Sequence, residues 1–431
     1  MIHSFNIVYS LLSKFERDGQ EETPSTPIWL VREMLDKLPP EIWSDKSKTF
    51  LDPACSTGTF LLEIVRKLDI GLALEIPDQT ERLEHILTKQ IWGLELNYVP
   101  FSVTKAAFEK LFINTTGIVG EVNIYHANAL DGVEEIKDMK FDVVVGNPPY
   151  QAPKKNKDTK DGANGDSIWP HFVRLSFSLM KSDGYICFVH PATWRKPQAP
   201  KSKVRDLFSM MTREHNMLYL SIHNQEDGKK TFNAGTRYDW YVAKNEPANG
   251  DNTTIRDEKG KISEILLSRY GWLPNSDLDV VLSLVDEAAD LMKPDCKKLV
   301  AKRYAYGMMN KKTHKEPNDV FCHPLIHSTP KKHIRYYYSS TDSDGHFGIS
   351  KAIFGDSGIN HVVVDVKGEY GMTEHAMAIP IESQEDGESL KEFLMSDKFQ
   401  NILKACSWSN YQIDRSLFES LKEGFWRAQN E

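Results

Sequence analysis

The chain has 431 residues, of which 40% are hydrophobic and 26% are charged, and its formal net charge is −8 at pH 7. These values are typical of a water-soluble globular protein long enough for two domains, and the acidic balance confines any nucleic-acid surface to a local basic patch. No apolar run reaches membrane-spanning length, the N-terminus lacks a signal-peptide pattern, and the five cysteines are scattered. We therefore expect a cytoplasmic protein with no membrane partner, no disulfide framework and no metal site.

The first functional pattern is a helix start within residues 22–35. Thr26 is a good N-cap, and Pro27 stands where a proline is tolerated in a first helical turn. Thr23-Pro24 offers a competing register for the same start. The N-terminus of such a helix favours an anionic ligand, because its free N–H groups and its dipole both attract negative charge.

Three short predicted strands carry polar side chains at their ends. The first ends at Asp52 and is followed by a loop of small residues, which is typical of the first turn of a doubly wound sheet, where cofactors bind at the carboxyl ends of the strands. The second ends in Glu95, whose carboxylate can accept hydrogen bonds from both hydroxyls of a ribose. The third leads to Asn128, whose amide oxygen can accept a hydrogen bond without the charge of a carboxylate.

The most specific pattern follows a fourth strand, residues 141–145, whose β-branched run predicts burial on both faces. After Gly146 comes Asn147-Pro148-Pro149-Tyr150. The two prolines fix φ and remove two N–H donors, so the carbonyls here are left without a strand partner. The Asn147 oxygen and the Pro148 carbonyl form an acceptor cluster beside the ring of Tyr150, and this cluster suits a planar heteroaromatic amine.

Two more strands are expected at residues 184–191 and 218–223. We expect residues 228–242 to form a hairpin that carries the aromatic Phe232 near its start. His190 is expected to be a histidine at a strand end and not a catalytic base. The polar stretch at residues 245–252 is typical of a linker and marks the expected domain boundary.

The C-terminal part contains a basic segment in an otherwise acidic chain. Between Lys293 and Arg335 there are eleven Lys/Arg against three acids, and tyrosines are interleaved with them. This pattern predicts a nucleic-acid footprint, although an ordinary solvated basic face would look the same. The candidate DNA-binding residues are Lys302, Arg303, Lys311, Lys312, Lys331 and Lys332.

Asn147-Pro148-Pro149-Tyr150 resembles motif IV of the S-adenosylmethionine-dependent amino-methyltransferases, especially the N6-adenine DNA methyltransferases. Asp52-Pro53-Ala54-Cys55-Ser56-Thr57-Gly58 resembles their motif I, with Ser56 where the family usually has glycine. Other motifs match by position: motif X at Thr26-Pro27, motif II at Glu95, motif III at Asn128 in place of the usual aspartate, and motif VIII at Phe232. The order X, I, II, III, IV, VIII, recognition region is that of the γ class.

This resemblance implies an α/β fold. It implies a doubly wound, mostly parallel, seven-stranded methyltransferase sheet of Rossmann-like type over residues 1–245, and a C-terminal α+β target-recognition, DNA-binding domain over residues 246–431. The implied cofactor is S-adenosyl-L-methionine. The residues implied to bind it are Thr26, Asp52, Pro53, Ala54, Thr57, Glu95, Leu96, Asn128, Ala129 and Asn147.

The activity implied by the resemblance is site-specific methylation of adenine N6 in double-stranded DNA, on a base flipped out of the duplex. The implied catalytic residues are Asn147, Pro148, Pro149, Tyr150 and Phe232. The implied location is the cytoplasm of a bacterial or phage-infected cell. The recognition sequence, the oligomeric state and the existence of a separate restriction endonuclease stay open.

Two other function classes are compatible with the motifs. Motif IV is shared with methyltransferases that act on protein glutamine or on RNA, and such an enzyme would be active without DNA. The other class is a non-catalytic DNA-binding relative, which the intact Asn147–Tyr150 turn disfavours.

Overall fold

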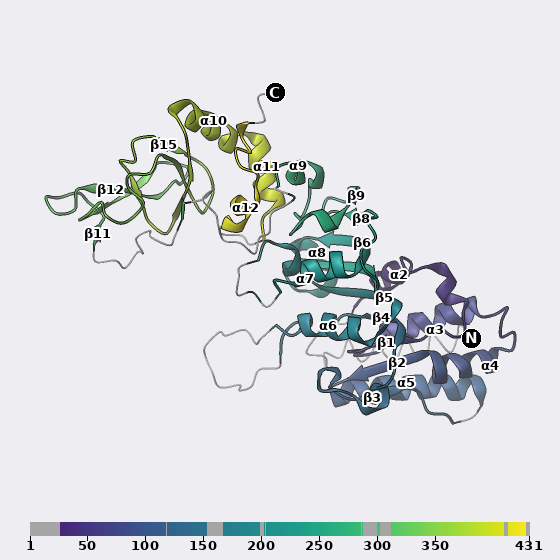
Figure 1. The fold of residues 1–431 in the computed structure, drawn as a ribbon. Coiled ribbons are helices and arrows are strands. Elements are labelled where there is room, and N and C mark those ends of the chain that lie inside the picture. Colours follow the sequence, from purple (N-terminus) through teal and green to yellow (C-terminus); the bar gives the residue numbers. More distant parts are fainter. Residues whose placement is uncertain are drawn as a thin grey trace. The chain divides into compact units, whose positions relative to one another are not determined.

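The computed structural model describes residues 26–117, 119–152, 167–198, 202, 204–285, 287, 300–301, 312–408 and 413–427. The chain forms two compact units (Figure 1). The N-terminal unit comprises Met1–Trp194 and Asp206–Ser268, and the C-terminal unit comprises Arg195–Arg205 and Arg269–Glu431. No helix among the described residues is both long enough and apolar enough to cross a bilayer.

The N-terminal unit is built on a nine-stranded sheet in the order β3-β2-β1-β4-β5-β7-β6-β8-β9. The strands from β3 to β5 are parallel, and β7 runs antiparallel to both of its neighbours, β5 and β6. This arrangement confirms the predicted α/β class. The strands are β1 (Phe50–Asp52), β2 (Ile91–Glu95), β3 (Ile124–His126), β4 (Phe141–Gly146), β5 (Met180–Pro191), β6 (Asn216–His223), β7 (Tyr238–Lys244), β8 (Thr253–Arg256) and β9 (Ile262–Ile265).

The last two strands extend the sheet beyond the seven that were expected. β8 pairs in parallel with β6, and β9 pairs antiparallel with β8. The N-terminal unit therefore continues to Ser268. The polar stretch at residues 245–252, where the boundary was expected, is a connection inside this unit, because the chain returns to the sheet directly after it.

Helices occupy the connections between these strands. They are α2 (Ile28–Leu35), α3 (Thr59–Gly71), α4 (Gln79–His85), α5 (Tyr98–Thr116), α6 (Trp169–Leu179), α7 (Leu207–Ser209) and α8 (Gln225–Phe232), with single turns η1 (Pro40–Trp43), η2 (Ile86–Gln90), η3 (Ala129–Asp131), η4 (Glu134–Ile136), η5 (Ala192–Arg195), η6 (Met210–Glu214) and η7 (Leu267–Arg269). Residues of α2, α3 and α5 share one hydrophobic core with Val143 and Val145 of β4. Every residue of β2 and β4 is buried, as expected for parallel strands at the centre of a sheet.

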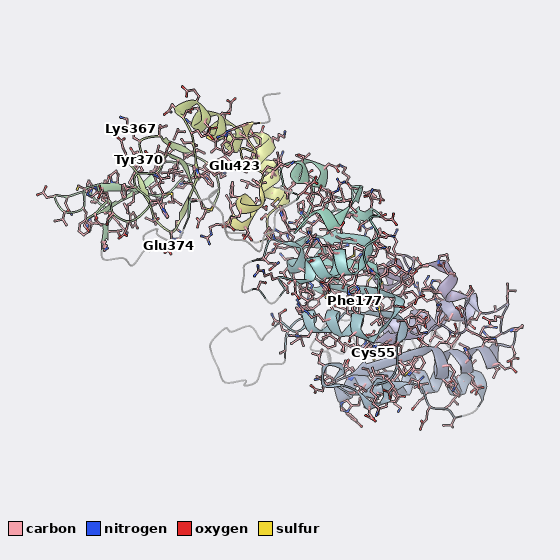
Figure 2. The ribbon with its side chains drawn as sticks, in the orientation of Figure 1. Cys55, Phe177, Lys367, Tyr370, Glu374 and Glu423 are labelled. Carbon is pink, nitrogen blue, oxygen red and sulfur yellow. The ribbon has the colours of Figure 1, made fainter. Side chains whose placement is uncertain are left out.

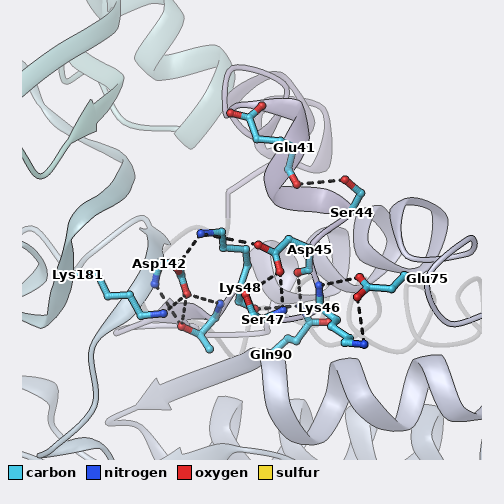
Figure 3. A network of polar contacts seen from close by, with 11 residues as sticks. Glu41, Ser44, Asp45, Lys46, Ser47, Lys48, Glu75, Gln90, Asp142 and Lys181 are labelled. Atoms are coloured by element: carbon cyan, nitrogen blue, oxygen red, sulfur yellow. Dashed lines mark hydrogen bonds and ion pairs between the residues drawn. The ribbon is translucent and has the colours of Figure 1, made fainter.

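A polar cluster closes the amino end of the sheet (Figure 3). The Asp142 carboxylate, at the start of β4, accepts hydrogen bonds from Lys48 at 3.2 Å, from Lys181 at 2.7 Å, and from the N–H and the hydroxyl of Thr49, both at 2.9 Å. Burial of Asp142 opposes its ionisation, but these hydrogen bonds outweigh it and hold the pKa of Asp142 below its ordinary value. The cluster ties together the segments that begin β1, β4 and β5.

The C-terminal unit contains two four-stranded sheets followed by helices. One sheet has the order β10-β17-β14-β15, and the other has the order β11-β13-β12-β16. Its elements are α9 (Leu278–Ser283), β10 (Val300–Ala301), β11 (Thr313–His314), β12 (His323–Ser328), β13 (Arg335–Ser339), β14 (Lys351–Gly355), β15 (Val363–Asp365), β16 (Gly371–Met372), β17 (Ala376–Pro380), α10 (Gln384–Met395), α11 (Asp397–Ala405) and α12 (Arg415–Ser420).

Candidate active site

The predicted cofactor residues lie along one edge of the N-terminal sheet. β3, β2, β1 and β4 are neighbours in that order and are parallel, so their carboxyl ends meet at the same edge. Asp52 and Glu95 end β1 and β2, Asn128 follows β3 by two residues, and Asn147 directly follows β4. The parallel order of the strands therefore brings these four residues to the same edge of the sheet.

Asp52 is buried at the centre of this edge. Its Oδ1 accepts a hydrogen bond from the Ala54 N–H at 3.0 Å. Burial raises the pKa of Asp52 to about 8, and the nearby Glu95 carboxyl adds to the shift. Gly146 lies so close that a Cβ there would stand 2.9 Å from Asp52 Oδ1, so the approach of β4 to β1 requires glycine at this position.

The loop after β1 turns through two residues with positive φ. Ser56, where the family usually has glycine, has a φ of 44°, and Gly58 has a φ of 75°. The Ser56 N–H donates to Glu95 Oε2 at 3.0 Å, and the Ser56 carbonyl accepts from the Thr104 hydroxyl at 2.7 Å. Figure 2 labels the neighbouring Cys55, whose side chain is buried. The left-handed backbone explains why glycine suits position 56, and the two hydrogen bonds explain how serine is held there.

Glu95 is the second buried acid. Its carboxylate accepts from the Ser56 N–H and, at 2.6 Å, from the Asn97 N–H. Burial raises the pKa of Glu95, and these two backbone donors oppose the rise. Each carboxylate oxygen has a further lone pair, so both can still accept a hydroxyl. Leu96 follows and is half exposed.

Asn128 caps the single turn η3. Its Oδ1 accepts from the Leu130 N–H at 3.2 Å, and its Nδ2 donates to Asp131 Oδ2 at 2.8 Å. Ala129, beside it, is buried. Together, Asp52, Glu95 and Asn128 supply acceptors for hydroxyls and for an amine, and this chemistry fits a nucleoside cofactor such as the expected S-adenosylmethionine.

Asn147 and Tyr150 form the other half of the site. The Asn147 Nδ2 donates to the Thr26 hydroxyl at 3.2 Å. The Asn147 Oδ1 and the Tyr150 hydroxyl are both buried, and neither makes a hydrogen bond of good geometry within the described ranges. Burial raises the pKa of Tyr150, and the approach of its hydroxyl to the Asn147 side chain only partly opposes that rise, so the hydroxyl stays neutral. A buried acceptor left unpaired costs about 1–3 kcal/mol, and a ligand with an N–H group would remove that cost.

The predicted capping role of Thr26 is wrong. Helix α2 begins at Ile28 with Pro27 at the N-cap position, and no side chain caps it. Thr26 is instead buried and holds the Asn147 amide. The alternative register at Thr23-Pro24 lies outside the described residues.

The predicted hairpin at residues 228–242 is also wrong. Helix α8 joins β6 to β7 in place of a hairpin turn. Asn224 and Asp227 form a reciprocal capping box that stabilises the start of this helix. Phe232 is the last residue of α8 and is buried against Tyr238, with ring centroids 4.9 Å apart at 81°. Its contact with a target base stays a prediction.

The candidate DNA-binding residues lie only in part within the described residues. Lys302, Arg303 and Lys311 lie outside the described residues. Lys312 is exposed and pairs with Asp344 at 3.0 Å. Lys331 and Lys332 are exposed in the turn between β12 and β13.

Three residues near the motifs were not found from the sequence. Thr104, in the middle of α5, supports Ser56, and Asp131 holds Asn128. Tyr238 packs on Phe232, and together with burial it raises the pKa of Tyr150, because two neighbouring phenolates would repel each other. None of the three follows a recognisable motif, because each acts through a contact between segments.

Comparison with known proteins gives one family match. Residues 67–229 match the family model described as Eco57I restriction-modification methylase. The chain is 26% identical over 249 residues to "Uncharacterized adenine-specific methylase" of Mycoplasma pneumoniae, which covers 43% of this chain and 58% of that protein. It is 24% identical over 279 residues to "Type II restriction enzyme and methyltransferase RM.Eco57I" of Escherichia coli, which covers 50% of this chain and 28% of that protein.

Among solved structures, the DrdV–DNA complex aligns with a TM-score of 0.42 at 18% identity, over 53% of this chain and 27% of that one. The chain thus spans 58% or less of the length of these curated relatives. The family match agrees with the resemblance inferred from the motifs, since residues 67–229 are similar to the Eco57I restriction-modification methylase family.

Proposed function

We propose that this protein transfers a methyl group from S-adenosylmethionine to the N6 amine of adenine in double-stranded DNA. The observation that carries the proposal is the buried, unpaired Oδ1 of Asn147 at the end of β4, beside the ring of Tyr150. An exocyclic amine is the group that such an acceptor requires. The relatives whose names refer to adenine methylation and to restriction-modification agree with this substrate.

Asn147 is held with its oxygen available for the substrate. The Thr26 hydroxyl accepts from the Asn147 Nδ2, so the oxygen end of the amide points away from Thr26. Asn147 Oδ1 and the Pro148 carbonyl together accept the two N6 hydrogens and turn the nitrogen lone pair out of the ring plane. Tyr150 stacks on the base, and Phe232 borders it. The base reaches these groups by leaving the duplex.

The cofactor supplies an electrophilic methyl group on a sulfonium when it is bound. In this chain Glu95 would accept hydrogen bonds from the ribose hydroxyls, Asn128 would accept one from the adenine amine, and the loop formed by residues 52–57 would border the remainder. Thr26, Leu96 and Ala129 would also border the cofactor. Positioning of the two reactants supplies most of the rate acceleration, since an amine that attacks the methyl carbon in line, opposite the sulfur that leaves, needs little help from a general base.

The C-terminal unit is proposed to read the DNA target, with Lys312, Lys331 and Lys332 contributing to phosphate contacts together with Lys302, Arg303 and Lys311. A separate restriction endonuclease is proposed as a functional counterpart. Both parts of the proposal go beyond residues 67–229.

The test is methyl transfer from labelled S-adenosylmethionine to unmethylated duplex DNA, followed by nucleoside analysis of the digest. We expect N6-methyladenine at one short sequence. Label recovered in RNA or in protein glutamine, with none in DNA, would contradict the proposed substrate and leave the methyltransferase site in place. The variant Asn147→Ala is the matched control, because it removes the acceptor and leaves Asp52, Glu95 and Asn128 unchanged.

A further inference from the structure

The turn after β3 contains a carboxylate that no motif includes. The family usually has aspartate at the position of Asn128, and the structure places the carboxylate of Asp131 beside that asparagine instead. Asn128 Nδ2 donates to Asp131 Oδ2 at 2.8 Å, and the Asp131 N–H donates to the Asn128 carbonyl at 3.1 Å. The two residues are therefore joined through their side chains and through the backbone of the turn.

This contact acts together with a hydrogen bond from the Leu130 N–H to fix which way the Asn128 amide points. The oxygen and nitrogen ends of an amide have almost the same shape, and they differ in that one accepts hydrogen bonds and the other donates them. A carboxylate only accepts, so Asp131 binds the nitrogen end. The oxygen end then accepts from the Leu130 N–H at 3.2 Å and keeps its second lone pair for a ligand. The bond to Asp131 is charge-assisted and therefore stronger than a neutral one.

Asn128 and Asp131 lie at the edge of the N-terminal sheet where the cofactor is proposed to bind. His126 pairs with Glu95 in the register of β2 and β3, and the Ala127 N–H donates to the Glu95 carbonyl at 3.0 Å. Asn128 is the next residue along the chain. It is half-buried and Asp131 is exposed, so the carboxylate supports the amide from the solvent side.

We propose that Asp131 is a positioning residue for cofactor binding, and this extends the proposed function. Asp131 holds Asn128 so that the amide oxygen accepts from the exocyclic amine of the cofactor's adenine. The pair thereby replaces the single aspartate of the family with two residues and selects a 6-amino purine. A ligand with a carbonyl at C6 meets an acceptor instead of a donor and binds poorly.

A purely structural role for the Asn128–Asp131 bond makes a different prediction. If the bond only closed the turn, its loss would weaken the binding of every nucleoside ligand by the same factor. If the bond orients the amide, its loss lets the amide rotate and present its nitrogen end to a C6 carbonyl. The ratio of affinities for an adenine and a hypoxanthine ligand separates these two roles.

The experiment is calorimetric binding of S-adenosylhomocysteine and of S-inosylhomocysteine to the full chain. Asp131→Ala removes the acceptor, which an asparagine would keep, and for this variant we expect S-adenosylhomocysteine to bind about 10-fold more weakly, as for the loss of one hydrogen bond to a charged group. We also expect the preference for the adenine ligand to shrink. Asp138→Ala is the matched control, because Asp138 is an exposed acid from the same β3–β4 connection, and it should leave both affinities unchanged.

The reciprocal double variant Asn128→Asp/Asp131→Asn tests the orientation directly. It keeps one carboxylate and one amide in contact but exchanges their places, so a carboxylate at position 128 accepts from the adenine amine. We expect its affinity for S-adenosylhomocysteine to return to within about threefold of the wild type.

Two outcomes would overturn the inference. One is an unchanged preference between the two ligands in Asp131→Ala. The other is a folded double variant that fails to regain affinity. Methyl transfer to DNA is not part of this readout, so wild-type protein that binds the cofactor but methylates no DNA would contradict the proposed substrate alone. Wild-type protein that binds neither ligand would contradict the proposed cofactor and the inference together.

Discussion

The two edges of the N-terminal sheet each bury an aspartate, and the two carboxyls have opposite environments. At the amino edge, Asp142 accepts hydrogen bonds from two lysines and from both donors of Thr49, and its pKa lies below the ordinary value. At the carboxyl edge, Asp52 accepts from the Ala54 N–H and lies near a second buried acid, Glu95, and its pKa rises to about 8.

This difference separates the residues that stabilise the fold from those that are proposed to bind a ligand. At the amino edge, the buried carboxylate of Asp142 has hydrogen-bond donors and positive charges beside it within the protein. The carboxyl edge holds two buried acids, a serine with positive φ and an unpaired Asn147 oxygen, and each of these costs folding free energy. A ligand that supplies hydroxyls and amines would offset those costs, so the destabilised edge is the one where chemistry is expected.

The largest effect is expected at the carboxyl edge from Asn147→Ala. Losing one preoriented hydrogen bond of this kind reduces the rate of a chemical step by about 10²–10³-fold. Cofactor affinity should change little, because Asp52, Glu95 and Asn128 are untouched. Single-turnover methyl transfer and binding of S-adenosylhomocysteine measure the two quantities separately.

Thr26→Val supplies a graded control for that experiment. It preserves the shape of Thr26 but removes the acceptor for Asn147 Nδ2, so the amide loses its orientation and the rate should fall by about 10-fold. Normal turnover by Asn147→Ala would contradict the assignment of the acceptor.

At the amino edge, Asp142→Asn should reduce stability and leave chemistry alone. The substitution leaves Lys48 and Lys181 without their carboxylate, and because both lysines are partly exposed to solvent we expect a loss of about 2 kcal/mol in the free energy of unfolding. Urea unfolding measures the loss. A methyl-transfer rate that fell as far as in Asn147→Ala, with protein still folded, would show that the two edges are not separate in function.

The pH dependence of stability should differ in sign between the two aspartates. The pKa of Asp52 is raised by folding, so the native state binds more protons than the unfolded state between pH 3.8 and about 8. Its contribution to stability therefore falls as pH rises through that window, by about 1.4 kcal/mol per pH unit. For Asp142 the pKa is lowered, so its contribution is complete above pH 3.8 and is lost as pH falls below it.

Unfolding of Asp52→Asn and of wild type at several pH values tests this sign. We expect the variant to gain stability relative to the wild type as pH increases from 5 to 8. A stability difference that stayed constant over this range would mean that Asp52 is ionised in the native state. Asp142→Asn is the comparison, because its stability difference from the wild type should stay constant over the same range.

The sequence predicted those site residues that a local pattern identifies within their own segment of the chain. Asp52, Glu95, Asn128 and Asn147 each end or follow a strand, and the parallel order of these strands brings them together. The acceptor at Asn147 followed from the two prolines after it. The positions of these residues could be predicted because strand ends and turns depend on local residue types, and their roles in binding and catalysis stay predictions.

The parts that were mispredicted depend on distant contacts. Thr26 holds Asn147 across 121 positions of the chain, which nothing in either segment indicates. β8 and β9 lie beyond a polar stretch that is typical of a linker, and their place in the sheet depends on pairing with β6. Helix α8 was missed because its capping residues, Asn224 and Asp227, lie between the expected strand and the expected hairpin. The helix also depends on the packing of its last residue, Phe232, in the hydrophobic core.

The smallest effect is expected from Ser56→Gly. Serine at a φ of 44° costs about 1 kcal/mol relative to glycine, since its Cβ crowds the backbone in the left-handed region. Glycine also increases the conformational entropy of the unfolded chain, and this offsets part of the gain. The net stabilisation should therefore be about 0.5 kcal/mol. The hydrogen bonds to Glu95 and from Thr104 use only the backbone of Ser56, so the substitution keeps them. Unchanged cofactor affinity with a small rise in the unfolding midpoint would show that the departure from the family's glycine affects stability and not binding. Weaker cofactor binding in Ser56→Gly would instead give the serine hydroxyl a direct part in the site.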